Sequence, residues 1–183
     1  ISGANIASLR VAWRAPSPDG QLSVSTPGGG SWSGPPAAVF AELQRRDPTR
    51  WRDNEPPNVN NYKATPLMVD GLLFVNTPTS VGAAYDAATG RLRWTYDPKS
   101  YEAGTTTMSL RWNQRGVAYW RDGDDARVLW GTGDGHLVAV DARTGQPVTG
   151  FGDGGRVDLM QGLPRATRGS RDYLNALTYS VQS

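Results

Sequence analysis

Short runs of hydrophobic residues separated by turn residues dominate the middle of the chain. Leu67–Val69 and Leu72–Val75 flank the dipeptide Asp70-Gly71, which favours a two-residue type I′ hairpin. A second pair of runs, Ala83–Tyr85 and Leu92–Tyr96, follows directly and is separated by a turn that ends in glycine. The pattern predicts four consecutive antiparallel strands, and therefore an all-β fold.

The same plan recurs further along the chain. The motif Ala-x-Asp-x-x-Thr-Gly occupies 84–90 and again 139–145, an offset of 55 residues (86 to 141). Trp94 closes the first copy, and the last predicted strand of the second copy holds Pro147, whose missing N–H places it on an outer edge. Four-stranded repeats of this kind predict propeller blades in which each outer tryptophan docks on the neighbouring blade. A β-sandwich with Trp94 in its core is the alternative.

The remaining segments lie outside these two repeats. Pro36 and Pro48 bracket a predicted short helix with an apolar stripe of Val39, Phe40 and Leu43. The chain therefore divides into an N-terminal strand region (1–26), a long loop with a short helix (27–61), a blade (62–98), a second blade (114–151), and a connection with the start of the next blade (152–183).

Composition excludes several classes of site. The 183 residues contain no Cys and one His, so disulfides, thiolate chemistry and a histidine-based zinc site or triad are not expected. With 19 basic and 17 acidic residues there is no polybasic surface, and nucleic acid is not an expected partner. No apolar run approaches the roughly 18 residues that span a bilayer. The single histidine, His136, follows a turn glycine and is expected at the surface.

Four stretches together match a known family pattern: Lys63–Gly71, the motif ending at Trp94, Gln114–Trp120 and Phe151–Leu159. They resemble the N-terminal part of the pyrroloquinoline-quinone (PQQ)-dependent alcohol and glucose dehydrogenases, and are more similar to the glucose-dehydrogenase-like branch. Leu9–Trp13 also looks like an early strand of that family. The resemblance implies an eight-bladed propeller, of which this chain supplies about two blades and the beginning of a third. We therefore expect an N-terminal fragment, inactive alone, that packs against the remaining blades.

Two cations occupy matching places in the repeats. Lys63 and Arg115 each precede the inner strand of a blade, 23 residues before Asp86 and 26 residues before Asp141 respectively. Like charges at one end of a central channel indicate an anionic ligand between them. The resemblance implies that this ligand is PQQ, which carries three carboxylates, and that Arg115 contacts it. Better-known members of the family carry an acidic or amide residue where this chain has Lys63. The alternative is that Lys63 and Arg115 are both rim residues exposed to water that bind no ligand.

The resemblance also implies the chemistry of the whole protein. It implies oxidation of an alcohol or sugar by hydride transfer to PQQ, calcium as Lewis acid, electrons passed to a respiratory quinone or cytochrome c, and a place in the periplasm or on the outer face of the inner membrane. The catalytic base and the calcium ligands are expected beyond residue 183, so no catalytic or metal residue is assigned here. A non-catalytic propeller acting as a scaffold or ligand sensor, and a carbohydrate-binding module, are the competing functions.

Overall fold

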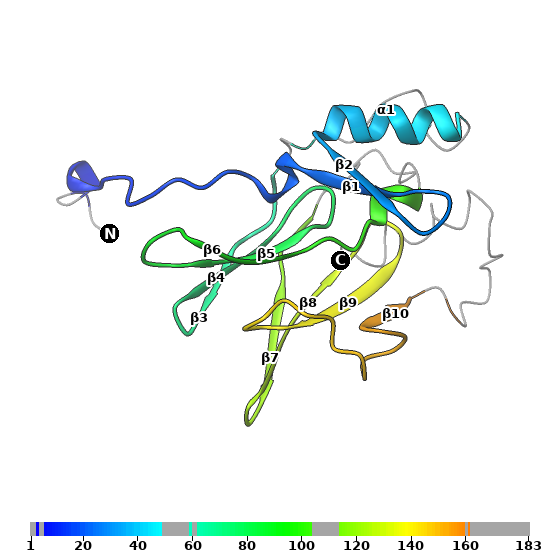
Figure 1. Cartoon of the computed structure of the whole chain (residues 1–183). Helices are drawn as coiled ribbons and strands as arrows, with labels where there is room; N and C mark the ends of the chain where they lie inside the picture. Colours follow the sequence, from blue (N-terminus) through cyan, green and yellow to red (C-terminus); the bar gives the residue numbers. More distant parts are fainter. Residues whose placement is uncertain are drawn as a thin grey trace.

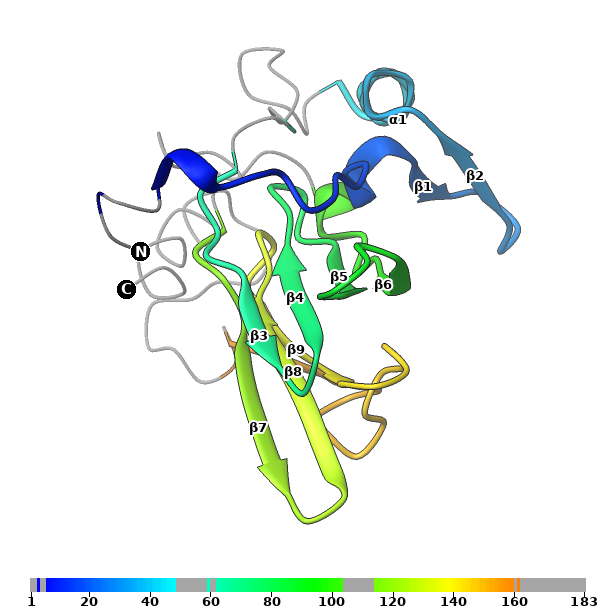
Figure 2. The ribbon, with the colours of Figure 1, turned by 90° about the vertical axis from the view of Figure 1, so that its left-hand side faces the viewer.

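The computed structural model describes residues 3, 6–48, 59, 62–103, 114–159 and 161. Two four-stranded antiparallel sheets lie next to each other, and a small hairpin with a helix lies at one end of them (Figures 1 and 2). None of the helices in these residues is long and apolar enough to cross a membrane. The all-β prediction of four-stranded blades is confirmed.

The first blade consists of β3 (Leu67–Val69), β4 (Leu72–Asn76), β5 (Gly82–Asp86) and β6 (Leu92–Tyr96), paired in that order. Asp70 and Gly71 have φ angles of 50° and 78°, as a type I′ turn between β3 and β4 requires. At the β5–β6 turn, the Asp86 carboxylate accepts hydrogen bonds from the backbone N–H and the hydroxyl of Thr89. Both predicted hairpins are therefore present.

The second blade consists of β7 (Ala118–Asp122), β8 (Asp125–Gly131), β9 (His136–Asp141) and β10 (Arg156–Asp158), in the order β10-β9-β8-β7. Its fourth strand differs from the prediction, which placed that strand around Pro147 and ended the blade at 151. Pro147 makes a single bridge to Val140, because a proline has no N–H to continue the ladder. The chain then turns back through Gly152, Gly154 and Gly155, all with positive φ, and pairs with β9 as β10. The residues predicted to begin a third blade lie outside the described residues.

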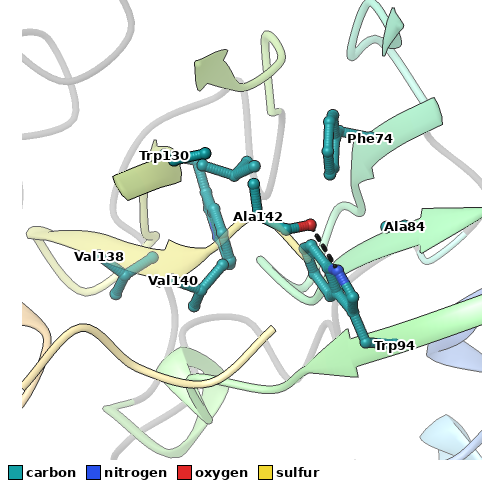
Figure 3. Packing of buried hydrophobic residues seen from close by; sticks show 9 residues of the cluster. Phe74, Ala84, Trp94, Trp130, Val138, Val140 and Ala142 are labelled. Atoms are coloured by element: carbon teal, nitrogen blue, oxygen red, sulfur yellow. Dashed lines mark hydrogen bonds between the residues drawn. The ribbon is translucent and has the colours of Figure 1, made fainter. Parts of the chain in front are cut away.

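The two blades bury a common apolar core (Figure 3). Its buried members are Phe74, Ala84 and Trp94 of the first blade, and Ala126, Val128, Trp130, Val138, Val140 and Ala142 of the second. The β8 residues alternate between buried and half-buried, which places one face of the second sheet against the first.

Tryptophan docking joins consecutive units. The indole N–H of Trp94 donates to the carbonyl of Ala142 at 3.0 Å (Figure 3). The Trp94 ring also covers Gly145, which has φ +70°. A Cβ at residue 145 would lie 2.6 Å from the Trp94 ring, so glycine is needed there both for backbone conformation and for space. The predicted docking of an outer tryptophan on the next blade is confirmed, and the sandwich alternative is not.

Trp13 docks on the first blade in the same way. Its indole N–H donates to the carbonyl of Ala87 at 3.0 Å, and its ring covers Gly90, which has φ +71°. Residues 9–16 nevertheless form no strand, contrary to the expected N-terminal strand. A strand needs a neighbouring backbone to bond to, and the described residues offer none at this position. Trp13 thus occupies on the first blade the place that Trp94 occupies on the second.

The segment between Trp13 and the first blade is more ordered than the predicted long loop. β1 (Leu22–Ser25) and β2 (Ser31–Gly34) form a hairpin around the glycine run, followed by α1 (Pro36–Arg46) as predicted. Short 3-10 helices cover Ile6–Ser8, Pro18–Gly20 and Ser100–Ala103. A second core joins α1 to the hairpin and the first blade; its buried members are Leu22, Val24, Val39, Phe40, Leu43, Val81 and Tyr101. β2 has the sequence Ser-Trp-Ser-Gly, and three of its four residues are exposed. The sequence therefore shows no alternation of hydrophobic and polar residues that would predict this strand.

Candidate functional site

The beginnings of the two inner strands meet at one end of the blades. Thr65, just before β3, and Gly116, just before β7, form a parallel bridge, and the Thr65 N–H donates to the carbonyl of Arg115 at 3.1 Å. Because neighbouring strands are antiparallel, the β4–β5 loop (77–81) and the β8–β9 loop (132–135) lie at this same end. We call this end, with residues 63–66, 77–81, 114–116 and 132–135, the bridged end.

The two predicted cations belong to neighbouring backbone segments at the bridged end. Lys63 is two residues before Thr65, and Arg115 immediately precedes Gly116. Both side chains are exposed, and neither has an acidic partner among the described residues. Adjacent unneutralised cations repel each other unless an anion binds between them. The arrangement fits a ligand with several carboxylates, because arginine offers a planar fork of donors and lysine a mobile point charge.

An amide network that the sequence analysis missed binds the residues on either side of Arg115. Asn76, which is fully buried, donates from Nδ2 to the Gln114 side-chain oxygen and to the carbonyl of Gly116, both at 3.0 Å. Gln114 in turn donates from Nε2 to the hydroxyl of Ser80 at 2.9 Å. A sequence signal was available, since a polar run at 76–80 directly follows the hydrophobic residues of β4.

A buried carboxyl, Asp19, ties the N-terminal segment to the loop between β4 and β5. It is 1% exposed, and its Oδ1 accepts from the hydroxyls of Thr77, at 2.5 Å, and Thr79. Its Oδ2 has no hydrogen-bond partner among the residues that the structure describes. Burial raises the pKa of Asp19, against the opposing effect of the two threonine hydroxyls. The ionised carboxylate is therefore disfavoured in the folded protein.

We expect replacement Asp19→Asn to flatten the pH dependence of stability. A carboxyl whose folded pKa lies above its unfolded value contributes stability below the unfolded pKa, and this contribution is lost as the pH rises through the folded pKa. Asparagine keeps an oxygen acceptor for both threonines. Because it does not ionise, it loses no stability as the pH rises. Urea unfolding between about pH 4 and about pH 8 should show a smaller decrease for the variant than for the parent chain. Two parallel pH curves would contradict this assignment.

His136 is half-buried and paired, which corrects the expected surface position. Its Nδ1 lies 3.2 Å from Oδ2 of Asp134, and their side chains are 30% and 13% exposed. The neighbouring carboxylate of Asp134 raises the pKa of His136, while burial opposes the shift. The pairing depends on the tight turn between β8 and β9, where Asp134 also accepts from the hydroxyl of Thr132.

Replacement Asp134→Asn should lower the pKa of His136 toward its ordinary value of 6.5. The chain has one histidine, so a single imidazole resonance followed by NMR during a pH titration reports this pKa directly. The matched variant Asp122→Asn removes a carboxylate from the opposite end of the same blade, where β7 ends, and should leave the titration in place. Equal midpoints for the parent chain and Asp134→Asn would rule out the ion pair.

The donor set of the bridged end suits anion binding more than metal binding. In the part of the chain that the structure describes, no three His, Cys, Asp or Glu side chains gather into a group that could hold a metal ion. Among the described residues of this end, the exposed charged side chains are Lys63 and Arg115, and the buried polar side chains are the hydroxyls of Thr77, Thr79, Ser80 and Thr132. The carboxylate of Asp134 also lies there and is paired with His136. The geometry can therefore bind and orient an anionic group.

The chain is similar to bacterial alcohol dehydrogenases. It is 45% identical over 86 residues to the dehydrogenase subunit of the alcohol dehydrogenase (quinone) of Acetobacter aceti, which covers 47% of this chain and 11% of that protein. It is 40% identical over 112 residues to the quinohemoprotein alcohol dehydrogenase ADH-IIG of Pseudomonas putida, which covers 58% of this chain and 15% of that protein. The chain thus spans less than a sixth of the length of either relative.

A solved structure and a family profile also match this chain. The solved structure of the quinohemoprotein alcohol dehydrogenase from Comamonas testosteroni aligns with 58% of this chain and 14% of its own, at 32% identity and a TM-score of 0.42. Residues 1–177 match the PQQ family profile described as "Glucose/ethanol/alcohol dehydrogenase, beta-propeller domain". That match covers nearly the whole chain and includes both blades and both cations. The chain belongs to the PQQ-dependent glucose/ethanol/alcohol dehydrogenase family.

Proposed function

We propose that this chain is the N-terminal part of a PQQ-dependent dehydrogenase that oxidises an alcohol or a sugar, and that Arg115 and Lys63 bind the carboxylates of the cofactor. One observation carries the proposal. In a chain of this family, two exposed cations lie on adjacent backbone segments joined by the bond from Thr65 N–H to the Arg115 carbonyl. A tricarboxylate bound there offsets their mutual repulsion.

The roles of the two cations differ. Arg115 offers paired donors for a carboxylate or for the adjacent carbonyls of the quinone, and its backbone is held by hydrogen bonds on both sides. Lys63 supplies a second positive charge on a flexible stem. PQQ, when bound, supplies the two-electron acceptor for oxidation at a carbon that bears a hydroxyl group. The residues of this chain would hold and orient it.

The remaining features of the proposal concern the whole protein. We assign calcium, the catalytic base and the other propeller blades to residues outside this chain, and electron transfer to a respiratory quinone or cytochrome c. Relatives named "Alcohol dehydrogenase (quinone)" and "1-butanol dehydrogenase (cytochrome c)" support acceptors of these kinds. We place the protein in the periplasm or on the outer face of the inner membrane. The family description includes both glucose and alcohol dehydrogenases, and both substrate classes therefore belong in the test.

Reconstitution tests this function. A protein of the relatives' length that carries this chain is prepared without cofactor, supplied with PQQ and Ca²⁺, and assayed for dye reduction with ethanol, 1-butanol and glucose. We expect reduction that depends on PQQ and on at least one of these substrate classes. Tight PQQ binding without turnover would favour a ligand sensor, and no PQQ binding would favour a non-catalytic scaffold.

A further inference from the structure

The backbone around Arg115 is held at consecutive residues. Gln114 is bonded through its side chain to Asn76 and Ser80, Arg115 through its carbonyl to the Thr65 N–H, and Gly116 through its carbonyl to Asn76 Nδ2. These distances lie between 2.9 and 3.1 Å, within the normal range for hydrogen bonds. The exposed Arg115 side chain is thus attached to a backbone that hydrogen bonds restrain at Gln114, Arg115 and Gly116.

The partners of Gln114 are themselves immobilised. Asn76 and Ser80 have no exposed surface, and Ser80 adopts a φ of +70° in the loop between β4 and β5. The Ser80 carbonyl accepts from the indole N–H of Trp130 at 2.9 Å, and its hydroxyl accepts from the backbone N–H of Gly133 at 3.2 Å. The restraint on Arg115 is therefore anchored in both blades.

The backbone conformation at Gly116 adds a further restraint on this segment. Its φ is +140°, and a Cβ at this residue would lie 2.9 Å from the Thr65 carbonyl oxygen. The bridge between Thr65 and Gly116 therefore requires glycine at residue 116. This bridge fixes the backbone from which the Arg115 side chain projects. An arginine on a free loop would lose backbone freedom on binding an anion, whereas this arginine has lost most of it already.

We propose that Gln114, held by Asn76 and Ser80, is a positioning residue that orients Arg115 toward the anionic cofactor. This inference rests on the proposed function, since it needs Arg115 to contact PQQ. Gln114 acts through its neighbour and touches no ligand itself. Its contribution is measured as cofactor affinity that exists when Arg115 is present and vanishes when Arg115 is removed.

A double-mutant cycle on PQQ affinity tests the proposal. The proteins are the parent of the relatives' length, Gln114→Met, Arg115→Ala and the double variant, each titrated with PQQ in the presence of Ca²⁺ by quenching of tryptophan fluorescence. Methionine keeps the length of glutamine and makes neither hydrogen bond. We expect Gln114→Met to weaken binding about 5–10-fold in the parent and less than about twofold in the Arg115→Ala background.

Thr144→Val is the matched control. It removes the hydrogen bond from the Thr144 hydroxyl to Asp141, 2.9 Å long, in the turn after β9 at the opposite end of the second blade. Its effect on PQQ affinity should stay below about twofold. If Gln114→Met fails to fold, Ser80→Ala takes its place in the cycle, because it removes the acceptor of Gln114 Nε2.

Each result decides a separate point. Equal weakening by Gln114→Met with and without Arg115 would overturn the positioning role and leave the proposed function intact. Weakening by Thr144→Val to the same degree would also overturn it, because general loosening of the blade would explain the result. Unchanged affinity in Arg115→Ala, or no PQQ binding by the parent, would overturn the proposed cofactor contacts and this inference together.

Discussion

Trp94→Ala is expected to lower the free energy of unfolding of the 183-residue chain by about 3–5 kcal/mol, the range for removing a buried tryptophan. The ring is 7% exposed, packs on Phe74 with 6.0 Å between centroids, and covers Gly145 of the other blade. The variant also loses the indole bond to the Ala142 carbonyl, which then lies buried without that donor. Urea unfolding followed by circular dichroism measures the change.

Trp32→Ala is the control for this prediction. Trp32 lies on β2, outside both blades, and is 40% exposed. Trp32→Ala should lower the free energy of unfolding by less than about 1 kcal/mol, because the Trp32 side chain buries little apolar surface. Similar losses of unfolding free energy in the two variants would mean that the docked Trp94 stabilises the protein no more than an exposed tryptophan does. That result would contradict the interface described for the two blades.

Removing both cations of the bridged end, Lys63→Ala with Arg115→Ala, should weaken PQQ binding by about 100-fold or more. A hydrogen bond to a charged group contributes about 1.5–3 kcal/mol, and each 1.4 kcal/mol corresponds to about tenfold in affinity. Arg115→Ala alone should account for the larger part, because its planar fork binds a carboxylate through two donors. The measurement is a PQQ titration of a protein of the relatives' length, monitored by tryptophan fluorescence.

Arg91→Ala separates this effect from a general change in charge. Arg91 is exposed at the β5–β6 turn, at the opposite end of the first blade, and its removal also takes away one positive charge. We expect less than about a twofold change in PQQ affinity, since interactions between exposed charges are largely screened beyond the Debye length of about 8 Å at physiological salt. Comparable losses at both ends would contradict a cofactor site at Lys63 and Arg115.

Local sequence features predicted the hairpins, the repeat, the helix and the docking tryptophan. Asp70-Gly71 favours one turn geometry, and the helix at Pro36–Arg46 has prolines on both sides and a regular apolar stripe. The repeat around Asp86 and Asp141 also placed Lys63 and Arg115 in matching positions. These features are local or periodic, so a single sequence is enough to recognise them.

The features missed by sequence analysis depend on neighbours far apart in the chain. β10 could not be separated from a loop, because a strand of three residues is too short to show a hydrophobic period. Gln114 looks like an ordinary polar residue until Asn76 and Ser80, 38 and 34 positions away, are seen to hold it. Asp19 likewise reads as a turn residue, and its burial by Thr77 and Thr79 appears in the tertiary structure.

By itself, then, the sequence determined the blades, their repeat and the presence of two cations before the inner strands. The tertiary structure decided that these cations belong to neighbouring backbone segments, that an amide network holds the backbone around Arg115, and that Trp13 and Trp94 make the same docking contact on successive blades. The physical reason is that turn chemistry and periodicity act over a few residues. A backbone bridge or a buried hydrogen bond depends on which distant groups the packed sheets bring within about 3 Å.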